Sequence, residues 1–375
     1  MKVLILSCST GEGHNSAAKA YMDYLISRGV ETDFRDVLSF AGKNATTRAS
    51  KVYNSSLQHH LFGFIYKIGG LVSDWTIGMR SPVYWANKKY CRRLGEYIQA
   101  NGFDAIVCTH IFAADSVSEL KDRGVVTQPT MLIMTDYTAI PFTKDSSLDW
   151  YLIPHEDVID FCVRHGLVRE KLLPWGIPVR MDFYKPKTER EEARALCASK
   201  FGFMDPGKPW FLLMTGSMGF GRIRQTAKAV VKKYGDGIEL AIVCGYNEKL
   251  QAELSSLAAE NPGVHVIGYT GEVSLLMDAC DVLFTKPGGL SSTEAAIKNI
   301  PIVHTNPIPG CETCNAEFFS SRNMSFYSKD IDRQVEAAGI LCKAGPERSR
   351  MLAAQTANTC KDTCERITEL LLGVK

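Results

Sequence analysis

Residues 284–319 read FTKPGGLSSTEAAIKNIPIVHTNPIPGCETCNAEFF, and this stretch decides the fold. The pattern predicts the end of a buried strand, a glycine turn, a short helix, a second buried strand and a proline-rich loop before another helix. Ser291, Ser292 and Thr293 follow the turn at Gly288 and Gly289 and are good N-cap types. A glycine turn that leads into a helix N-terminus presents unpaired backbone N–H groups at the positive end of the helix dipole. That geometry favours a bound phosphate or diphosphate.

Two carboxylates accompany this turn. Glu294 lies in the first turn of the predicted helix, and Glu312 follows the loop at 306–310. Ionised carboxylates accept hydrogen bonds from hydroxyl groups, so they suit the ribose and the hexose of a nucleotide-sugar. A phosphate cradle with two such carboxylates nearby therefore predicts a nucleotide-sugar site.

Length and composition bound the remaining possibilities. A chain of 375 residues usually forms two domains, and 45% hydrophobic with 22% charged residues is typical of a soluble globular protein. A net charge of +2 argues against a nucleic-acid partner held by bulk charge. The N-terminal apolar run is too short for a secretory leader, so the twelve cysteines are expected to be reduced in a cytoplasmic setting. No run of about 18 apolar residues predicts a membrane-spanning helix.

The chain begins with KVLILSC at 2–8, which is typical of a buried parallel strand. A loop with Gly11, Gly13 and His14 follows, and then a helical pattern from Asn15. The loop lacks the third glycine of a dinucleotide fingerprint, so we do not expect an NAD site. It is either an ordinary strand-to-helix turn or the place of a catalytic base, because histidine can accept a proton near neutral pH.

The segment 57–97 is rich in aromatic residues and locally basic, and glycines interrupt any long helix. Two hypotheses fit it equally from the residues alone. It either lies at a bilayer interface with anionic lipid, or it is a helical excursion that packs its aromatics inward. The candidate membrane and acceptor residues are Phe62, Phe64, Trp75, Trp85, Lys88, Lys89, Arg92 and Arg93.

Alternating strands and helices then predict a parallel sheet in each half of the chain. Asp136 follows one strand and is interpreted as a catalytic group or a turn cap. We predict an N-terminal domain at 1–184, a C-terminal domain at 185–345, and a last helix within 346–375 that packs back across both. A second glycine loop with Gly216, Ser217 and Gly219 is another candidate for the diphosphate; it lacks the Gly-Lys-Ser/Thr of a Walker A motif.

Several of these motifs together resemble one family. They are S-x-S-T-G-x-G-H at 7–14, T-G-S-x-G at 215–219, T-K-P-G-G-L at 285–290, S-T-E-A at 292–295 and N-P-I-P-G-x-E at 306–312. The pattern is similar to the monogalactosyldiacylglycerol synthases and processive diacylglycerol glycosyltransferases of glycosyltransferase family 28. It is more distantly similar to the enzyme that adds N-acetylglucosamine to the lipid-linked peptidoglycan precursor.

The resemblance implies a GT-B fold, in which two Rossmann-like domains with parallel sheets face a central cleft. It implies an inverting transfer of hexose from UDP-glucose or UDP-galactose to diacylglycerol, without a metal or other cofactor, by a protein attached peripherally to the inner face of the cell membrane. His14 would be the base, with Asp136 beside it, and Glu294 would hold the ribose. Glu312 would hold the sugar, and Gly216, Ser217, Gly219, Gly288, Gly289 and Ser291 would surround the diphosphate.

The sequence also departs from the family. Cys311 stands where relatives have glutamine, which leaves the hexose undecided. Residues 137–140 lack the histidines usual in glucosyl enzymes, which leaves the acceptor undecided beyond a lipid. A polyprenyl-diphosphate-linked sugar is an alternative acceptor, and a non-catalytic UDP-sugar sensor on the membrane is an alternative function. A zinc site of two cysteine pairs would need 311 and 314 to meet 360 and 364, a spacing unlike zinc ribbons. The sequence does not define an oligomeric state.

Overall fold

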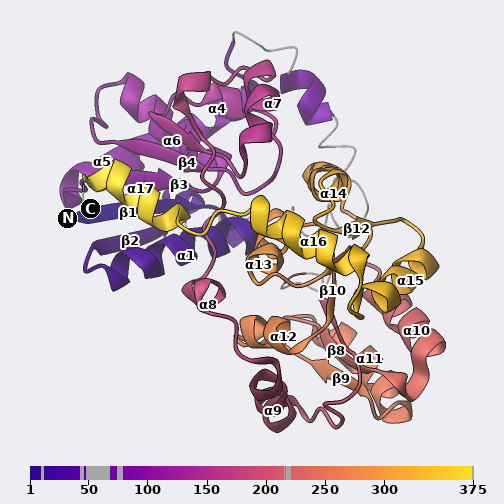
Figure 1. Ribbon diagram of the computed structural model, residues 1–375. Coiled ribbons are helices and arrows are strands. Elements are labelled where there is room, and N and C mark those ends of the chain that lie inside the picture. Colours follow the sequence, from indigo (N-terminus) through magenta and orange to yellow (C-terminus); the bar gives the residue numbers. More distant parts are fainter. Residues whose placement is uncertain are drawn as a thin grey trace. The chain divides into compact units, whose positions relative to one another are not determined.

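A computed structural model describes residues 1–9, 12–42, 46–47, 68–73, 79–214, 216 and 221–373 (Figure 1). The chain divides into two compact units, each described here by itself. The first unit comprises 1–181, 309–311 and 360–375, and the second comprises 182–308 and 312–359. The predicted boundary at 184 lies three residues beyond the end of the first unit's long N-terminal segment.

The first unit contains a parallel sheet of six strands in the order β2-β1-β3-β4-β5-β6. Every residue of the central strands β3 and β4 is buried, which explains their continuous apolar sequences. The strands are β1 (Lys2–Ser7), β2 (Glu31–Asp36), β3 (Ala105–Cys108), β4 (Thr130–Ile133), β5 (Trp150–Leu152) and β6 (Leu172–Leu173).

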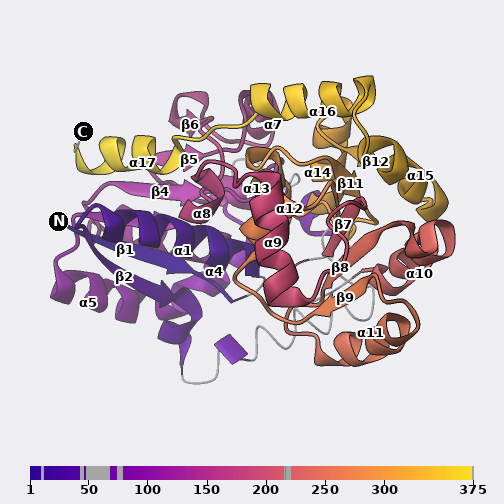
Figure 2. The same cartoon turned by 60° about the horizontal axis from the view of Figure 1, so that its bottom comes forward.

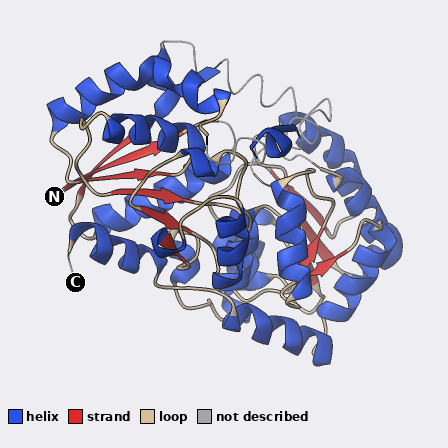
Figure 3. Ribbon diagram, turned by 90° about the horizontal axis from the view of Figure 1, so that it is seen from above, coloured by secondary structure: helices blue, strands red, loops and turns tan. Residues whose placement is uncertain are grey.

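Helices flank this sheet, and short 3-10 turns connect them (Figures 2 and 3). The α-helices are α1 (Glu12–Ser27), α4 (Pro82–Asn87), α5 (Cys91–Asn101), α6 (Ile111–Asp122), α7 (Ile159–Arg164) and α17 (Thr363–Leu372). The 3-10 helices are η1 (Val37–Ala41), η2 (Lys88–Tyr90), η3 (Thr143–Asp145), η4 (Glu156–Val158) and η5 (Arg169–Lys171). Helix α8 (Met181–Tyr184) spans the boundary between the units.

The second unit repeats this plan with a parallel sheet in the order β12-β11-β10-β7-β8-β9. Its strands are β7 (Trp210–Met214), β8 (Glu239–Val243), β9 (Val264–Ile267), β10 (Val282–Thr285), β11 (Ile302–His304) and β12 (Phe326–Tyr327). Its helices are α9 (Arg190–Phe201), α10 (Ile223–Tyr234), η6 (Gly235–Gly237), α11 (Glu248–Glu260), α12 (Val273–Ala279), α13 (Gly289–Ile297), α14 (Cys311–Ser321), α15 (Ile331–Leu341) and α16 (Pro346–Ala357).

The C-terminal residues form two helices where the sequence predicted one, so that prediction was wrong. Helix α16 ends at Ala357, and its Met351 packs into the core of the second unit. Helix α17 begins at Thr363 and buries Ile367 and Leu371 against strands of the first unit (Figure 1). The two apolar faces thus belong to different cores.

None of the helices in the described residues is long and apolar enough to cross a membrane.

Candidate functional site

Two groups of candidate residues lie at the carboxyl ends of the two parallel sheets, which is where ligands bind in open α/β folds. In the first unit, His14 lies in the first turn of α1, immediately after β1. Thr109 follows β3, and Thr135 and Asp136 follow β4. Because β1, β3 and β4 are neighbours in the sheet, their carboxyl ends bring these residues together.

Hydrogen bonds define which nitrogen of His14 carries a proton. Nδ1 of His14 lies 2.7 Å from the backbone carbonyl oxygen of Thr109 and 3.1 Å from the hydroxyl of Thr135. A carbonyl oxygen only accepts, so Nδ1–H donates to it. In the neutral ring the lone pair is then on Nε2. The arrangement therefore supplies a histidine whose outer nitrogen can accept a proton.

The surroundings also favour the neutral form of this ring. Burial lowers the pKa of His14, and it outweighs the opposing effects of Asp136 and the Thr109 carbonyl, which favour protonation. The ring of His110 stands edge-on to His14 at 4.8 Å, and burial together with His14 holds the pKa of His110 well below its ordinary value. Both rings are thus neutral at pH 7. Asp136 acts on His14 through its charge, which favours the protonated ring.

The glycines of the N-terminal loop contribute less to this geometry. Gly13 is exposed in the first turn of α1, and a Cβ added there would meet no heavy atom within 4 Å of the described residues. A side chain at this position would therefore fit the chain as it stands. Gly11 lies outside the described residues.

In the second unit, helix α13 begins one residue after Gly288, which is its N-cap. No side chain caps this end, and Gly289 and Ser291 lie in the first turn. The expectation of a serine or threonine N-cap was wrong, because the residues involved are already inside the helix. The Thr293 hydroxyl donates to the Gly289 carbonyl at 2.7 Å, and Ser292 contacts His304 at 3.0 Å. The N-terminus of α13 thus keeps its backbone N–H groups for an anion.

Lys286, which the sequence analysis did not single out, stands beside this helix end. Its ammonium group lies 2.6 Å from Oε1 of Glu312. Gly216 has a φ of +80°, and a Cβ there would lie 3.3 Å from Cε of Lys286. A lysine directly before the glycine turn was the available signal, since it places a cation beside a phosphate cradle. Ser217 and Gly219 lie outside the described residues.

The two predicted carboxylates are both buried in the second unit. Glu312 lies in the first turn of α14, and its Oε2 accepts from the backbone N–H of Ile308 at 2.8 Å. Asn315 on the same helix donates to the carbonyl of Pro287 at 3.0 Å, which ties α14 to the glycine turn. Glu294 lies in α13, five residues after Gly289. The structure therefore brings Lys286, Glu312 and the glycine turn into one cluster.

An exposed aromatic pair lies at the same edge of this sheet and was also missed. Tyr246 follows β8 and Tyr269 follows β9. Their rings stack at 4.3 Å with an interplanar angle of 13°, although the residues are 56% and 62% exposed. Two tyrosines held flat against each other at a sheet edge offer a surface on which a planar ring can stack.

The chain is similar to known proteins in sequence and in fold. Residues 14–179 match the family described as monogalactosyldiacylglycerol (MGDG) synthase. The processive diacylglycerol beta-glucosyltransferase of Bacillus subtilis (strain 168) is 26% identical over 347 residues, which cover 91% of this chain and 86% of that protein. The chain is thus similar to diacylglycerol glycosyltransferases over most of its length.

Solved structures show the same fold as this chain. MurG of Acinetobacter baumannii matches with a TM-score of 0.65 and 13% identity, over 100% of this chain and 99% of that one. Anabaena HepE in complex with UDP-glucose matches with a TM-score of 0.60 and 12% identity, over the whole of both chains. The two parallel sheets and these matches confirm the predicted GT-B fold.

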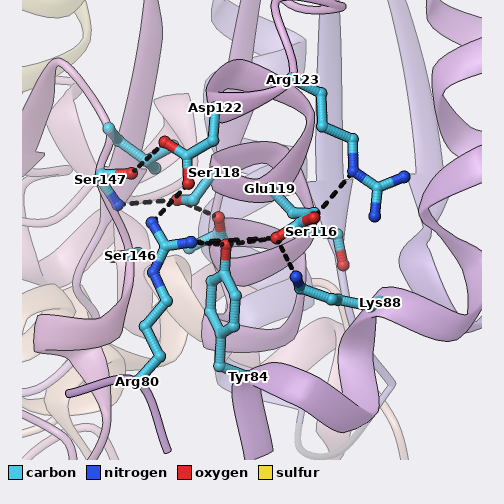
Figure 4. A network of polar contacts seen from close by, with 12 residues as sticks. Arg80, Tyr84, Lys88, Ser116, Ser118, Glu119, Asp122, Arg123, Ser146 and Ser147 are labelled. Carbon is cyan, nitrogen blue, oxygen red and sulfur yellow. Dashed lines mark hydrogen bonds and ion pairs between the residues drawn. The ribbon is translucent and has the colours of Figure 1, made fainter.

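The predicted membrane segment at 57–97 is described only in part. Phe62, Phe64 and Trp75 lie outside the described residues. Trp85 on α4 is 55% exposed, with the Lys88 ammonium 3.9 Å above its ring. Lys89, Arg92 and Arg93 are exposed. Lys88 differs from these three, because it also forms an ion pair of 2.9 Å with the buried Glu119 (Figure 4).

Glu119 on α6 anchors this segment through several donors (Figure 4). Its carboxylate accepts from Tyr84 at 2.9 Å and pairs with Lys88 at 2.9 Å and with Arg123 at 2.8 Å. Burial raises the pKa of Glu119, but these three hydrogen bonds outweigh burial and hold the pKa below its ordinary value. The carboxylate is therefore charged, and it fixes α4 and η2 on α6.

The cysteines show no metal centre among the residues described. All twelve are free thiols, and no group of three or more His, Cys, Asp or Glu side chains in the described residues is placed to hold a metal.

Proposed function

We propose that this protein is an inverting hexosyltransferase that moves a hexose from UDP-glucose or UDP-galactose to the hydroxyl of diacylglycerol. The product would be a monoglycosyldiacylglycerol. The observation that carries the proposal is the state of His14, a neutral histidine whose Nδ1–H is held by the Thr109 carbonyl. Such a ring accepts a proton at Nε2, which is the task of a base in glycosyl transfer to a hydroxyl. Similarity to diacylglycerol glycosyltransferases supports the choice of acceptor.

The second unit supplies what a UDP-sugar requires. The open N-terminus of α13, with Gly288, Gly289 and Ser291, and the ammonium of Lys286 suit the diphosphate. Glu294 would accept from the ribose hydroxyls, and Glu312 from those of the hexose.

The stacked pair Tyr246 and Tyr269 offers its surface to the uracil ring. Gly216, Ser217 and Gly219 would complete the diphosphate site by the motif they share with the family.

The chemistry follows from these roles. Nε2 of His14 takes the proton of the acceptor hydroxyl while that oxygen bonds to the anomeric carbon from the face opposite the diphosphate. The bond from the anomeric carbon to the diphosphate oxygen breaks, and its electron pair leaves with UDP. Backbone N–H groups and Lys286 stabilise the negative charge that develops there, so we expect no metal or other cofactor to be needed. Asp136 would stabilise the imidazolium that forms.

The proposed setting is the cytoplasmic face of the cell membrane, to which the protein would attach peripherally. The exposed Trp85 and the cations Lys89, Arg92 and Arg93 support this setting, because an indole ring and basic groups together bind anionic bilayer surfaces.

The test uses liposomes of diacylglycerol and anionic phospholipid with each UDP-sugar, and separates the products by chromatography and mass. Monohexosyldiacylglycerol is the expected product. Product only from a polyprenyl-diphosphate-linked acceptor would overturn the choice of lipid, and UDP-sugar binding without UDP release from any acceptor would indicate a sensor. His14→Ala should abolish transfer and keep UDP affinity. His165→Ala is the matched control, because His165 ends α7 and so lies toward the amino edge of the same sheet.

Glu294→Ala provides a separate check on the donor site. The loss of a charged acceptor of hydroxyl groups should weaken UDP binding by about 1.5–3 kcal/mol, and calorimetry with UDP measures it. An unchanged affinity would remove Glu294 from the proposed site.

A further inference from the structure

The second unit contains a cavity of about 780 Å³ that none of the roles above uses. It lies beside the first residue of β7, Trp210, and the residue before β10, Asp281, and therefore at the amino ends of these parallel strands. The proposed donor residues follow the carboxyl ends of the same strands. The length of β7, at roughly 3.3 Å per residue, separates the two edges by about 13 Å.

The wall of this cavity is rich in cations. Arg190, Arg194 and Lys208 line it, and the only carboxylates among its lining residues are Glu191 and Asp281. Arg190 and Arg194 both pair with Asp281, so one buried carboxylate serves two guanidinium groups.

Further basic charge stands behind this wall. Arg348 donates to the backbone carbonyls of Asp281 and Leu341, contacts that do not neutralise its charge. Burial, and after it the charge of Arg348, lowers the pKa of Arg190. Burial, and after it the charge of Arg190, lowers the pKa of Arg194 to about 10. Burial is thus the main cause of both shifts, and repulsion between the guanidinium groups adds to it.

The two wall arginines differ in freedom. Arg194 is held by the carbonyls of Ala279 and Lys208, both at 3.1 Å, and its guanidinium stacks 4.8 Å from the Trp210 ring. The side chain of Arg190 is 49% exposed, although it forms an ion pair with Asp281. Arg190 can therefore turn to a second anion, whereas Arg194 stays in place and keeps Asp281 charged and oriented.

The N-terminus of α9 adds donors at the same place. Arg190 is the first residue of this helix, and the N-cap Glu189 makes no side-chain capping bond. The backbone N–H groups of the first turn and the dipole of a 12-residue helix favour an anion beside Arg190 and Lys208. Glu191 and Glu192 in the same turn oppose this effect, and Lys208 lies 3.7 Å from Asp205, a contact that an incoming anion would replace.

We propose that this cavity is a second ligand site, which takes a phosphate monoester or another phosphate-bearing molecule between Arg190 and Lys208. A guanidinium group binds phosphate oxygens in a bidentate manner, and a lysine adds a point charge. The volume is within the range of small-molecule sites, so a ligand larger than phosphate itself fits. The phosphate group can belong to a soluble ester or to a phospholipid headgroup.

The experiment titrates inorganic phosphate and glycerol 3-phosphate into the full chain by calorimetry, with UDP present at saturation. Binding should persist under UDP. Arg190→Gln and Lys208→Gln should each raise the dissociation constant at least tenfold, which corresponds to about 1.4 kcal/mol. Arg190→Lys should lose less phosphate affinity than Arg190→Gln. Lys228→Gln, on the exposed face of α10, removes the same charge elsewhere in the unit and should change nothing.

Vesicles of phosphatidylcholine with and without phosphatidic acid distinguish the two sources of phosphate. Binding of phosphatidic acid vesicles that Arg190→Gln abolishes, together with weak binding of soluble esters, identifies the headgroup as the ligand. Three results would each overturn the proposal: no binding of any phosphate compound, phosphate binding that UDP abolishes, or a loss of phosphate affinity in Lys228→Gln equal to that in Arg190→Gln. Unchanged UDP affinity in the Arg190 variants shows that they fold.

Discussion

The buried carboxyl group of Asp115 should make the stability of the protein depend on pH. The residue lies in α6 and is 1% exposed. Asn87 donates to its Oδ2 at 2.9 Å, whereas its Oδ1 has no hydrogen-bond partner among the described residues. Burial raises the pKa of Asp115 to about 8, the negative charge of Asp145 adds to this effect, and the Asn87 hydrogen bond opposes it. The carboxyl is therefore protonated in the folded protein at neutral pH.

The sign of the pH dependence follows from linkage. In the unfolded chain this carboxyl ionises near pH 3.8, and in the folded chain near pH 8. Between these values the folded state binds the extra proton, so the free energy of unfolding falls as pH rises. The slope is about 1.4 kcal/mol per pH unit, and the loss between pH 5 and pH 8 reaches about 4 kcal/mol as an upper bound. Asparagine has the same shape and does not titrate.

Asp115→Asn should accordingly stabilise the protein relative to wild type by an amount that grows from pH 5 to pH 8. Urea denaturation of both proteins at pH 5, 6.5 and 8 at one ionic strength measures this difference, in which the other titrating groups cancel. Asp23→Asn, on the exposed face of α1, is the matched control. A stability difference that does not change with pH would refute the reasoning, because it would mean that Asp115 is already ionised at pH 5.

Three further predictions concern other contacts. Glu119→Gln should lower the free energy of unfolding by about 1–3 kcal/mol, because Lys88 loses its buried partner, and hydrogen exchange should show faster opening of 82–90; slow exchange there would contradict the anchoring role. Lys286→Met should weaken UDP binding about tenfold to a hundredfold. Glu312→Gln should weaken the binding of UDP-hexose and leave the affinity for UDP unchanged. Calorimetry with both ligands measures these affinities, and the reverse pattern would mean that the two residues have exchanged roles. Gly216→Ala should cost about 1–2 kcal/mol of stability for its positive φ and weaken UDP by displacing Lys286, and a fully stable variant with normal UDP affinity would contradict both effects.

The sequence predicted the strands well where their pattern was long and apolar. KVLILSC at 2–8, which predicted a buried strand, is a strand that ends one residue earlier than predicted. The short strands β6 and β12 were missed, because two residues carry no periodicity, and they exist only through pairing with β5 and β11. Local pattern thus predicted both sheets except for one edge strand of each.

The candidate sites were predictable only in part, for a different reason. Motifs identified His14 and Glu312, but their partners depend on contacts distant in sequence. Thr109 is 95 residues from His14, and Lys286 is 26 residues from Glu312. The N-terminus of α13 shows the limit of local rules. Serine is a residue type that often caps helices, but the hydroxyl of Ser292 forms a hydrogen bond with His304 instead. The helix begins earlier, with Gly288 as its N-cap.

Helix α6 connects the candidate base to the described part of the predicted membrane segment within the first unit. Its N-cap is His110, whose ring contacts His14, and Glu119 on the same helix anchors Lys88 and Tyr84 beside Trp85 (Figure 4). The ten residues from 110 to 119 span about 13 Å of helix. His110 and Glu119 lie on the same helix, which holds them at a fixed distance. If Trp85 binds a bilayer, the helix therefore also fixes the distance of His14 from that bilayer. Glu119→Gln, which removes the ion pair with Lys88, should therefore impair transfer to lipid in vesicles more than it impairs UDP binding.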